Sequence, residues 1–103
     1  MTAWDHRNWW ASLTEQQRRE HNLKSALGTF KASLSDIEDL YRCHQLSANV
    51  TIKLTDGLQE SLLGMERAAA HFSLHLYADV RATRERVARV RLRARSDPKV
   101  VLS

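Results

Sequence analysis

The sequence predicts an all-α protein whose main element is a long antiparallel helical hairpin, similar to a coiled coil. Three observations support this prediction. Apolar residues recur at steps of four and three in two stretches of the chain, and this spacing forms an apolar stripe along one face of a helix. Helix-breaking residues are scarce, with one Pro and three Gly among 103 residues. A β-branched stretch lies between the two stripes and marks the expected turn.

Each arm of the predicted hairpin carries one apolar stripe, and we expect the two stripes to form the interaction seam of a helical assembly. In the first arm the predicted seam consists of Leu23, Leu27, Phe30, Leu34, Ile37 and Tyr41. In the second arm it consists of Leu58, Leu62, Met65, Ala69, Phe72 and Leu76. Beyond Leu76 the stripe continues at Val80, where the regular alternation of steps slips slightly, like a stutter in a coiled coil.

The two arms are predicted to run from about 13 to 47 and from about 56 to 95. Ser12 and Glu15 have the spacing of a capping box, which places the start of the first arm. Thr55-Asp56-Gly57 combines cap and turn residues, which places the start of the second arm. The chain is therefore divided into a Trp-rich segment (1–12), the hairpin (13–95) and a C-terminal tail (96–103).

A two-helix hairpin has a single shared seam, so it leaves apolar residues uncovered. The apolar positions off the seam are Leu40, Leu46, Ile52, Leu54, Leu63, Leu74 and Leu92. They favour completion of the hairpin to a bundle, either by oligomerisation or by a partner. Two alternatives remain open. One is a single continuous helical rod, and the other is a short three-helix fold, with a break near Gly28 or with the N-terminal segment docked as a third helix.

All three tryptophans of the chain lie within its first ten residues: Trp4, Trp9 and Trp10. Tryptophan buries a large area and loses few rotamers, so it is a strong anchor in protein interfaces. One interpretation is that Trp9 or Trp10 packs on Leu13 and closes the end of the hairpin. The other is that the tryptophans anchor the chain in a groove of another protein. The two interpretations are compatible, since the rings need not face the same way.

Residues 80–95 form the best-defined chemical feature, with seven arginines and a single acid, Glu85. The predicted contacts to an anionic partner are Arg81, Arg84, Arg86, Arg89, Arg91, Arg93 and Arg95. Such a basic amphipathic helix binds phosphates, an anionic membrane surface or an acidic protein, and arginine favours bidentate contacts to carboxylate or phosphate. The simpler interpretation is a helix with solvated, salt-bridged flanks.

No pattern of catalytic residues stands out, so we expect no enzyme and no cofactor. The chain has no Gly-rich phosphate loop, no Cys-x-x-Cys pair and no nucleophile elbow. His71 and His75 have the spacing that metal-binding helices use. Asp79 extends the row, but one ion cannot reach residues spread over about 12 Å of helix. We therefore predict no metal site.

The sequence is typical of an intracellular protein in a reducing compartment, either cytoplasmic or nuclear. The single Cys43 cannot form an internal disulfide, and the polar N-terminus lacks the apolar core of a secretory signal. No apolar run approaches the length of a membrane span.

These observations favour a non-enzymatic protein–protein interaction module, acting as a scaffold or adaptor subunit of a helical assembly. Its partner is expected to be a protein, in a homo-oligomer or in a hetero-oligomeric helical complex. The alternative is a nucleic-acid-binding protein that uses the Arg-rich helix 80–95. This alternative is less favoured, because the rest of the chain is almost neutral and no base-reading motif is visible.

Overall fold

The computed structural model describes residues 3–99 of the chain, and the surroundings of side chains within residues 7–99. The described chain consists of four α-helices without a β-strand: α1 (Ala3–Ser12), α2 (Glu15–Arg42), α3 (Ala48–Ala69) and α4 (Leu74–Arg95). The prediction of an all-α protein is therefore confirmed. The end of the predicted C-terminal tail, residues 100–103, lies outside the described residues.

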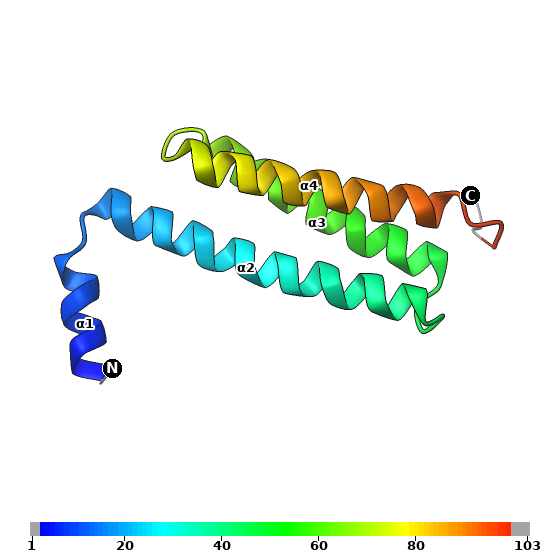
Figure 1. Ribbon diagram of the computed structural model, residues 1–103, viewed down its shortest axis with the longest axis horizontal. Coiled ribbons are helices and arrows are strands. Elements are labelled where there is room, and N and C mark those ends of the chain that lie inside the picture. Colours follow the sequence, from blue (N-terminus) through cyan, green and yellow to red (C-terminus); the bar gives the residue numbers. More distant parts are fainter. Residues whose placement is uncertain (1–2, 100–103) are drawn as a thin grey trace.

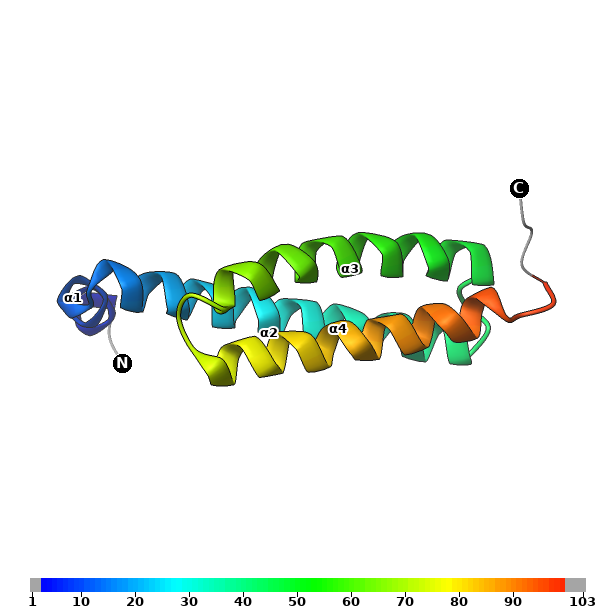
Figure 2. The ribbon, with the colours of Figure 1, turned by 90° about the horizontal axis from the view of Figure 1, so that it is seen from above.

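Helices α2, α3 and α4 lie side by side as a three-helix bundle, and α1 stands apart at one end (Figure 1). The densest packing joins α3 and α4, which form an antiparallel helical hairpin, while α2 lies along both of them. The chain reverses direction at each turn of the bundle, so α2 and α4 run in the same direction (Figure 2). The molecule measures 53 × 30 × 20 Å along its principal axes. The third helix that covers the hairpin thus comes from the same chain.

The core consists of apolar side chains that the three bundle helices turn toward one another. Leu34 of α2, Leu62 of α3 and Val87 of α4 have no exposed surface. Burial of such a side chain contributes about 1.5–3 kcal/mol to stability. Seven residues of the predicted seam are buried, namely Leu27, Leu34, Ile37, Leu62, Met65, Ala69 and Leu76. The other five, Leu23, Phe30, Tyr41, Leu58 and Phe72, are half-buried. The seam therefore packs largely within one chain, and five of its residues keep part of their surface exposed.

Helix α2 begins with a capping box that lies two residues later than the predicted one. The Thr14 hydroxyl accepts the backbone N–H of Gln17 at 3.1 Å, and the Gln17 side chain accepts the backbone N–H of Thr14 at 2.9 Å. Ser12, which was predicted to cap this helix, lies in the last turn of α1, where its hydroxyl donates to the Trp9 carbonyl at 2.6 Å. The Trp-rich segment therefore forms a helix of its own.

The bend between α2 and α3 lies at residues 43–47, earlier in the chain than predicted. The backbone N–H groups of His44 and Gln45 donate to the carbonyls of Tyr41 and Leu40, at 3.1 and 2.8 Å respectively. These two hydrogen bonds form the Schellman motif that ends many helices. His44 takes the left-handed position of the motif, with a φ of 60°. Glycine is the usual residue there, so the sequence contained no plain sign of this helix end.

The β-branched stretch that we expected to form the bend is instead the beginning of α3. Ser47 caps this helix by accepting the backbone N–H of Val50 at 3.2 Å. Thr51 and Thr55 have no exposed surface. Their hydroxyls donate to backbone carbonyls four residues earlier, at 2.9 and 2.8 Å. Because these hydrogen bonds satisfy the buried hydroxyls, packing in the core outweighs the low helix propensity of β-branched residues.

The predicted second arm is interrupted by a turn at residues 70–73. The Ser73 hydroxyl caps α4 by accepting the backbone N–H of Leu76 at 3.3 Å. Phe72, which was predicted within the seam, lies in this turn. The turn contains neither Gly nor Pro, and its sign in the sequence is the register slip beside Leu76. The interruption lets α4 fold back on α3 and bury Val80, which a straight helix would leave uncovered.

We predict that Leu62→Ala lowers the free energy of unfolding by about 2–5 kcal/mol, because it removes a fully buried side chain and leaves a cavity. Leu92→Ala is the matched control, since Leu92 also lies within a helix but is 66% exposed, and it should change stability by less than about 0.5 kcal/mol. Urea unfolding followed by circular dichroism measures both values. Equal effects of the two substitutions would contradict the three-helix core.

Candidate interaction surfaces

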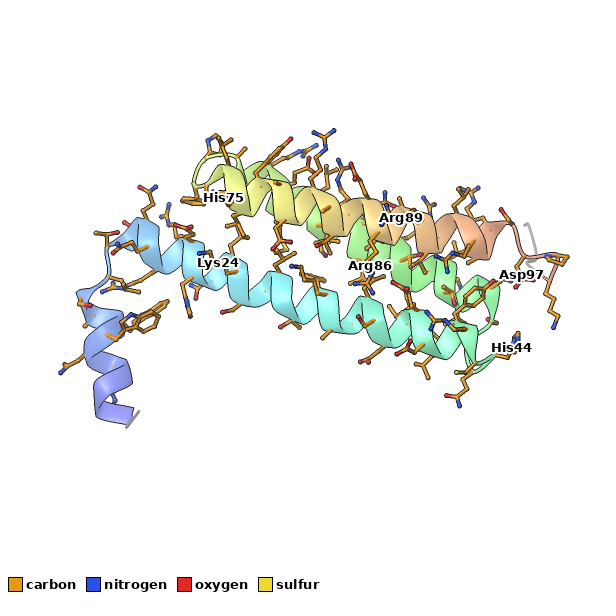
Figure 3. The ribbon with its side chains drawn as sticks, in the orientation of Figure 1. Lys24, His44, His75, Arg86, Arg89 and Asp97 are labelled. Atoms are coloured by element: carbon orange, nitrogen blue, oxygen red, sulfur yellow. The ribbon has the colours of Figure 1, made fainter. Side chains whose placement is uncertain are left out.

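Charged side chains join α4 to α2, the two helices that run in parallel. The Nε of Arg86 donates to the Glu38 carboxylate at 2.8 Å, and its Nη2 donates to the Ser35 hydroxyl at 3.2 Å. Arg86 lies between the two helices in Figure 3. Nearer the start of α4, the Nζ of Lys31 donates to the Asp79 carboxylate at 2.8 Å. Packing between these helices is less dense than between α3 and α4, so long polar side chains make much of the connection.

Two further ion pairs join α4 to α3. Arg84 contacts Glu66, with its Nη2 at 3.3 Å from Oε1, and Arg91 contacts Asp56. Glu66 is only 8% exposed. A carboxylate buried to this extent is costly unless a cation compensates its charge. Arg84 supplies that charge and is therefore part of the structure of the bundle.

The seven arginines that we predicted to contact an anionic partner separate into two groups. Four form ion pairs with carboxylates of this chain: Arg81 with Glu85, Arg84 with Glu66, Arg86 with Glu38 and Arg91 with Asp56. The other three, Arg89, Arg93 and Arg95, are exposed and form no ion pair within the described part of the chain. Arg84, Arg86 and Arg91 thus bind carboxylates on neighbouring helices, whereas Arg81, whose pair with Glu85 lies at the surface of α4, is exposed like the three unpaired arginines.

Tyr41 and Asp97 connect the end of α2 to the segment after α4. The Tyr41 hydroxyl donates to the Asp97 carboxylate at 2.8 Å. This hydrogen bond raises the pKa of Tyr41, because loss of the proton would break it and place a phenolate beside a carboxylate. The pKa of Asp97 is lowered, first by the backbone N–H of Lys99, which donates at 2.9 Å, and then by the Tyr41 hydroxyl.

Two of the three tryptophans gather around a histidine where α1 meets α2. The His21 ring lies edge-on to both indoles, with centroid distances of 5.1 Å to Trp9 and 5.5 Å to Trp10. Arg18 stacks over Trp10 at 5.9 Å. Its guanidinium also donates to the carbonyls of Trp10 and Ala11, both at 3.0 Å, which satisfies backbone groups at the end of α1. His21 could not be recognised from the sequence, because it lies across a helix break from the indoles.

We call α1 together with Trp9, Trp10 and His21 the tryptophan arm. Extensive contacts between helices link α2, α3 and α4 with one another, whereas α1 leaves the bundle in both views (Figures 1 and 2). Trp9 is 39% exposed. An open cavity of about 360 Å³ lies beside Trp10, and its other lining residues are Arg7, His21, Asn22 and Ser25. The side chain of Trp4, the third predicted anchor, lies outside the described residues.

Apolar residues off the seam remain at the surface, as their number in the sequence indicated. Five of the predicted positions are exposed, namely Leu40, Leu54, Leu63, Leu74 and Leu92, whereas Leu46 and Ile52 are half-buried. Val50 belongs to the β-branched stretch at which we expected the bend, and it is also exposed, at 43%. Among these residues only Val50 and Leu54 lie one helical turn apart, so they form a continuous apolar surface on α3.

His71 and His75, whose spacing is one that metal-binding helices use, do not lie on the same helix. His71 lies in the turn before α4, and His75 lies in the first turn of α4 (Figure 3). Within the described residues, no group of three or more His, Cys, Asp or Glu side chains is arranged to hold a metal ion. None of the helices described here combines the length and apolar character that crossing a membrane requires.

Comparison of the chain with protein-family models, with curated proteins and with solved structures gave no significant match. The geometry of the surfaces is therefore the basis for the function proposed below.

We predict that Arg84→Met lowers the free energy of unfolding by about 1–3 kcal/mol, because it leaves the buried Glu66 carboxylate without its cation. Arg89→Met is the matched control on the same helix, and it should stay within about 0.5 kcal/mol of the wild type. The double variant Arg84→Met/Glu66→Met should regain stability relative to Arg84→Met, since no buried charge remains. Urea titrations of the four proteins test this, and a double variant less stable than Arg84→Met would refute the assignment.

We predict that the contact between Tyr41 and Asp97 stabilises the fold at neutral pH and is lost at both extremes. The lowered pKa of Asp97 gives stability above its unfolded pKa of about 3.8, and this is lost as the pH falls through the folded value. The raised pKa of Tyr41 gives stability below about pH 10, and this is lost as the pH rises through the folded value.

Tyr41→Phe should therefore raise the pKa of Asp97, measured by NMR of its side-chain carboxyl carbon, while leaving it below the unfolded value because the Lys99 N–H still donates. Tyr77→Phe is the control and should leave the pKa of Asp97 where it is in the wild type. An Asp97 titration that Tyr41→Phe does not change would show that the hydrogen bond is absent in solution.

Proposed function

We propose that the protein is a non-catalytic interaction module, a scaffold or adaptor subunit, that binds another protein through the tryptophan arm. The observation that carries this proposal is the position of the tryptophans. All three belong to a ten-residue helix that stands outside the bundle (Figure 1). Tryptophans that serve the fold of a small protein are normally placed in its core, whereas the core of this chain is built from Leu, Val, Met and Ala.

The tryptophan arm is held in place without being covered. An isolated helix of ten residues is only marginally stable in water. Here its last carbonyls accept hydrogen bonds from Arg18, and its indoles pack on His21. These contacts reduce the conformational entropy that a partner would otherwise have to overcome on binding. Trp9 nevertheless keeps 39% of its surface exposed, which suits an anchor residue that inserts into a pocket.

The chemistry around the arm indicates the kind of partner. Indole rings favour an apolar pocket, with a hydrogen-bond acceptor for each ring N–H. Arg7 lines the open cavity beside Trp10, and Arg18 stacks over the same ring. A protein groove with an apolar floor and an acidic rim would complement both properties. We therefore propose a protein partner with such a groove.

The alternative function is nucleic-acid binding by α4, and one observation favours it. Arg89, Arg93 and Arg95 are exposed without an ion pair in the described chain. Against it, Arg84, Arg86 and Arg91 are engaged with carboxylates of the bundle. The few arginines that stay exposed on α4 neutralise few phosphates, so this surface supports only weak, strongly salt-dependent binding.

We predict that Trp9→Ala weakens binding to the natural partner by about 30-fold or more, the loss expected for a tryptophan at the centre of an interface. Wild type, Trp9→Ala and the matched surface control Leu92→Ala serve as baits in quantitative affinity capture. Proteins retained by the wild type and the control but lost from Trp9→Ala are then purified, and their affinity is measured by calorimetry.

Two results would contradict the proposal. In the first, no protein distinguishes Trp9→Ala from the control. In the second, nucleic acid is the molecule retained, and its retention depends on Arg89, Arg93 and Arg95 rather than on Trp9. Replacement of the three arginines by Gln tests the second result directly, because none of them forms an ion pair in the described chain.

A further inference from the structure

The side of α3 that faces away from the bundle carries apolar residues beside charged ones. We call this surface the α3 outer face and define it by Val50, Lys53, Leu54, Gly57, Glu60, Ser61 and Gly64, which are all exposed. Their spacing of three and four places them along one side of the helix. Val50 and Leu54 are each 43% exposed. The opposite side of α3 is buried in the core through residues such as Leu62 and Ala69.

The charges of two α3 outer faces complement each other when the two helices run antiparallel. Lys53 and Glu60 are seven residues apart, about 10 Å along the helix axis, so they cannot pair within one helix. Neither of them forms an ion pair within the described part of the chain. They lie on the same flank of the face, and in an antiparallel pair of helices equal flanks meet. A second copy running in the opposite direction therefore brings Lys53 to Glu60 twice.

The apolar residues fit the same arrangement. When Lys53 meets Glu60 of a second copy, the midpoint of the contact falls beside Gly57, and Val50 comes to lie over Gly64 of the other chain. A Cβ added at Gly57 or Gly64 would meet nothing within 4 Å, and neither has a positive φ. The surface at these two positions therefore leaves room for the backbone of another helix to approach closely.

We propose that two copies of this chain form a symmetric dimer in which the α3 outer faces pack antiparallel. Val50 and Leu54 are covered by the second copy, and two Lys53–Glu60 pairs fix the register. A shifted register that pairs Glu60 with Arg67 would leave Val50 and Leu54 uncovered, so it is disfavoured. This dimer goes beyond the function proposed above, because it uses a different surface and leaves the tryptophan arm free.

The first experiment reverses the charges and measures the dimer dissociation constant of the purified chain by sedimentation equilibrium. Lys53→Glu and Glu60→Lys should each weaken the dimer by about tenfold or more, because each brings like charges together twice. The double variant Lys53→Glu/Glu60→Lys should restore the wild-type constant, since the pairs are re-formed with their signs exchanged. Leu54→Glu should also weaken the dimer, whereas Leu92→Glu, on exposed α4 surface, should not.

The second experiment tests the position of the two-fold axis by oxidative crosslinking in a Cys43→Ser background. Gly57→Cys should form a disulfide between two copies, because the two residues at position 57 face each other. Gly28→Cys is the matched control, since this glycine of α2 is equally open, and it should remain uncrosslinked. Val50→Cys should also remain uncrosslinked, because identical residues at this position meet only in a parallel dimer.

Three results would overturn the dimer. The first is a wild-type chain that stays monomeric at a concentration 100 times that used for crosslinking. The others are single charge variants that leave the dissociation constant unchanged, or a double variant that does not restore it. Trp9→Ala should leave the dissociation constant unchanged. Loss of the dimer therefore does not bear on the tryptophan arm, and loss of partner binding in Trp9→Ala does not bear on the dimer.

Discussion

The ion pairs of α4 constrain which helices can pack against it. The apolar stripe of this helix is narrow, with Val80, Val87 and Val90 buried and arginines on both flanks. Burying the stripe brings those flanks against neighbouring helices, and this is favourable only where carboxylates receive the guanidinium groups. Glu66 and Asp56 of α3 meet one flank, and Glu38 of α2 meets the other. Hydrophobic packing and charge pairing thus select the same three-helix arrangement.

Much of the fold could be predicted from the sequence, because the heptad spacing of apolar residues directly reflects the core of a helical protein. The positions of the turns could not. The end of α2 uses His44 where glycine is usual, and the turn before α4 contains no breaker residue. Thr51 and Thr55 suggested a bend, yet their hydroxyls bond to the helix backbone and let them be buried. The helix ends and the buried threonines thus depend on local backbone hydrogen bonds that residue type alone does not reveal.

The candidate surfaces could be predicted from the sequence to differing extents. The tryptophans were recognised because their residue type alone suggests an anchor. The arginines were recognised as a group, but sequence could not separate those that bind carboxylates of the bundle from Arg89, Arg93 and Arg95, since the partners lie far away in the chain. The α3 outer face was recognised only in part: Leu54 was among the predicted off-seam apolar residues, whereas Val50 joined it at the surface only once the β-branched stretch proved to be helical.

The separation of aromatic residues in this molecule has a spectroscopic consequence. All three indoles belong to the tryptophan arm, whereas the bundle contains tyrosine and phenylalanine as its aromatic residues. Tryptophan emission therefore reports on one end of the molecule and depends little on the packing of the core. A denaturation curve recorded by tryptophan fluorescence would follow the detachment of α1, and tyrosine absorbance or helical ellipticity would follow the bundle. The three tryptophans are thus an intrinsic fluorescent probe at the end of the molecule where we expect the partner to bind.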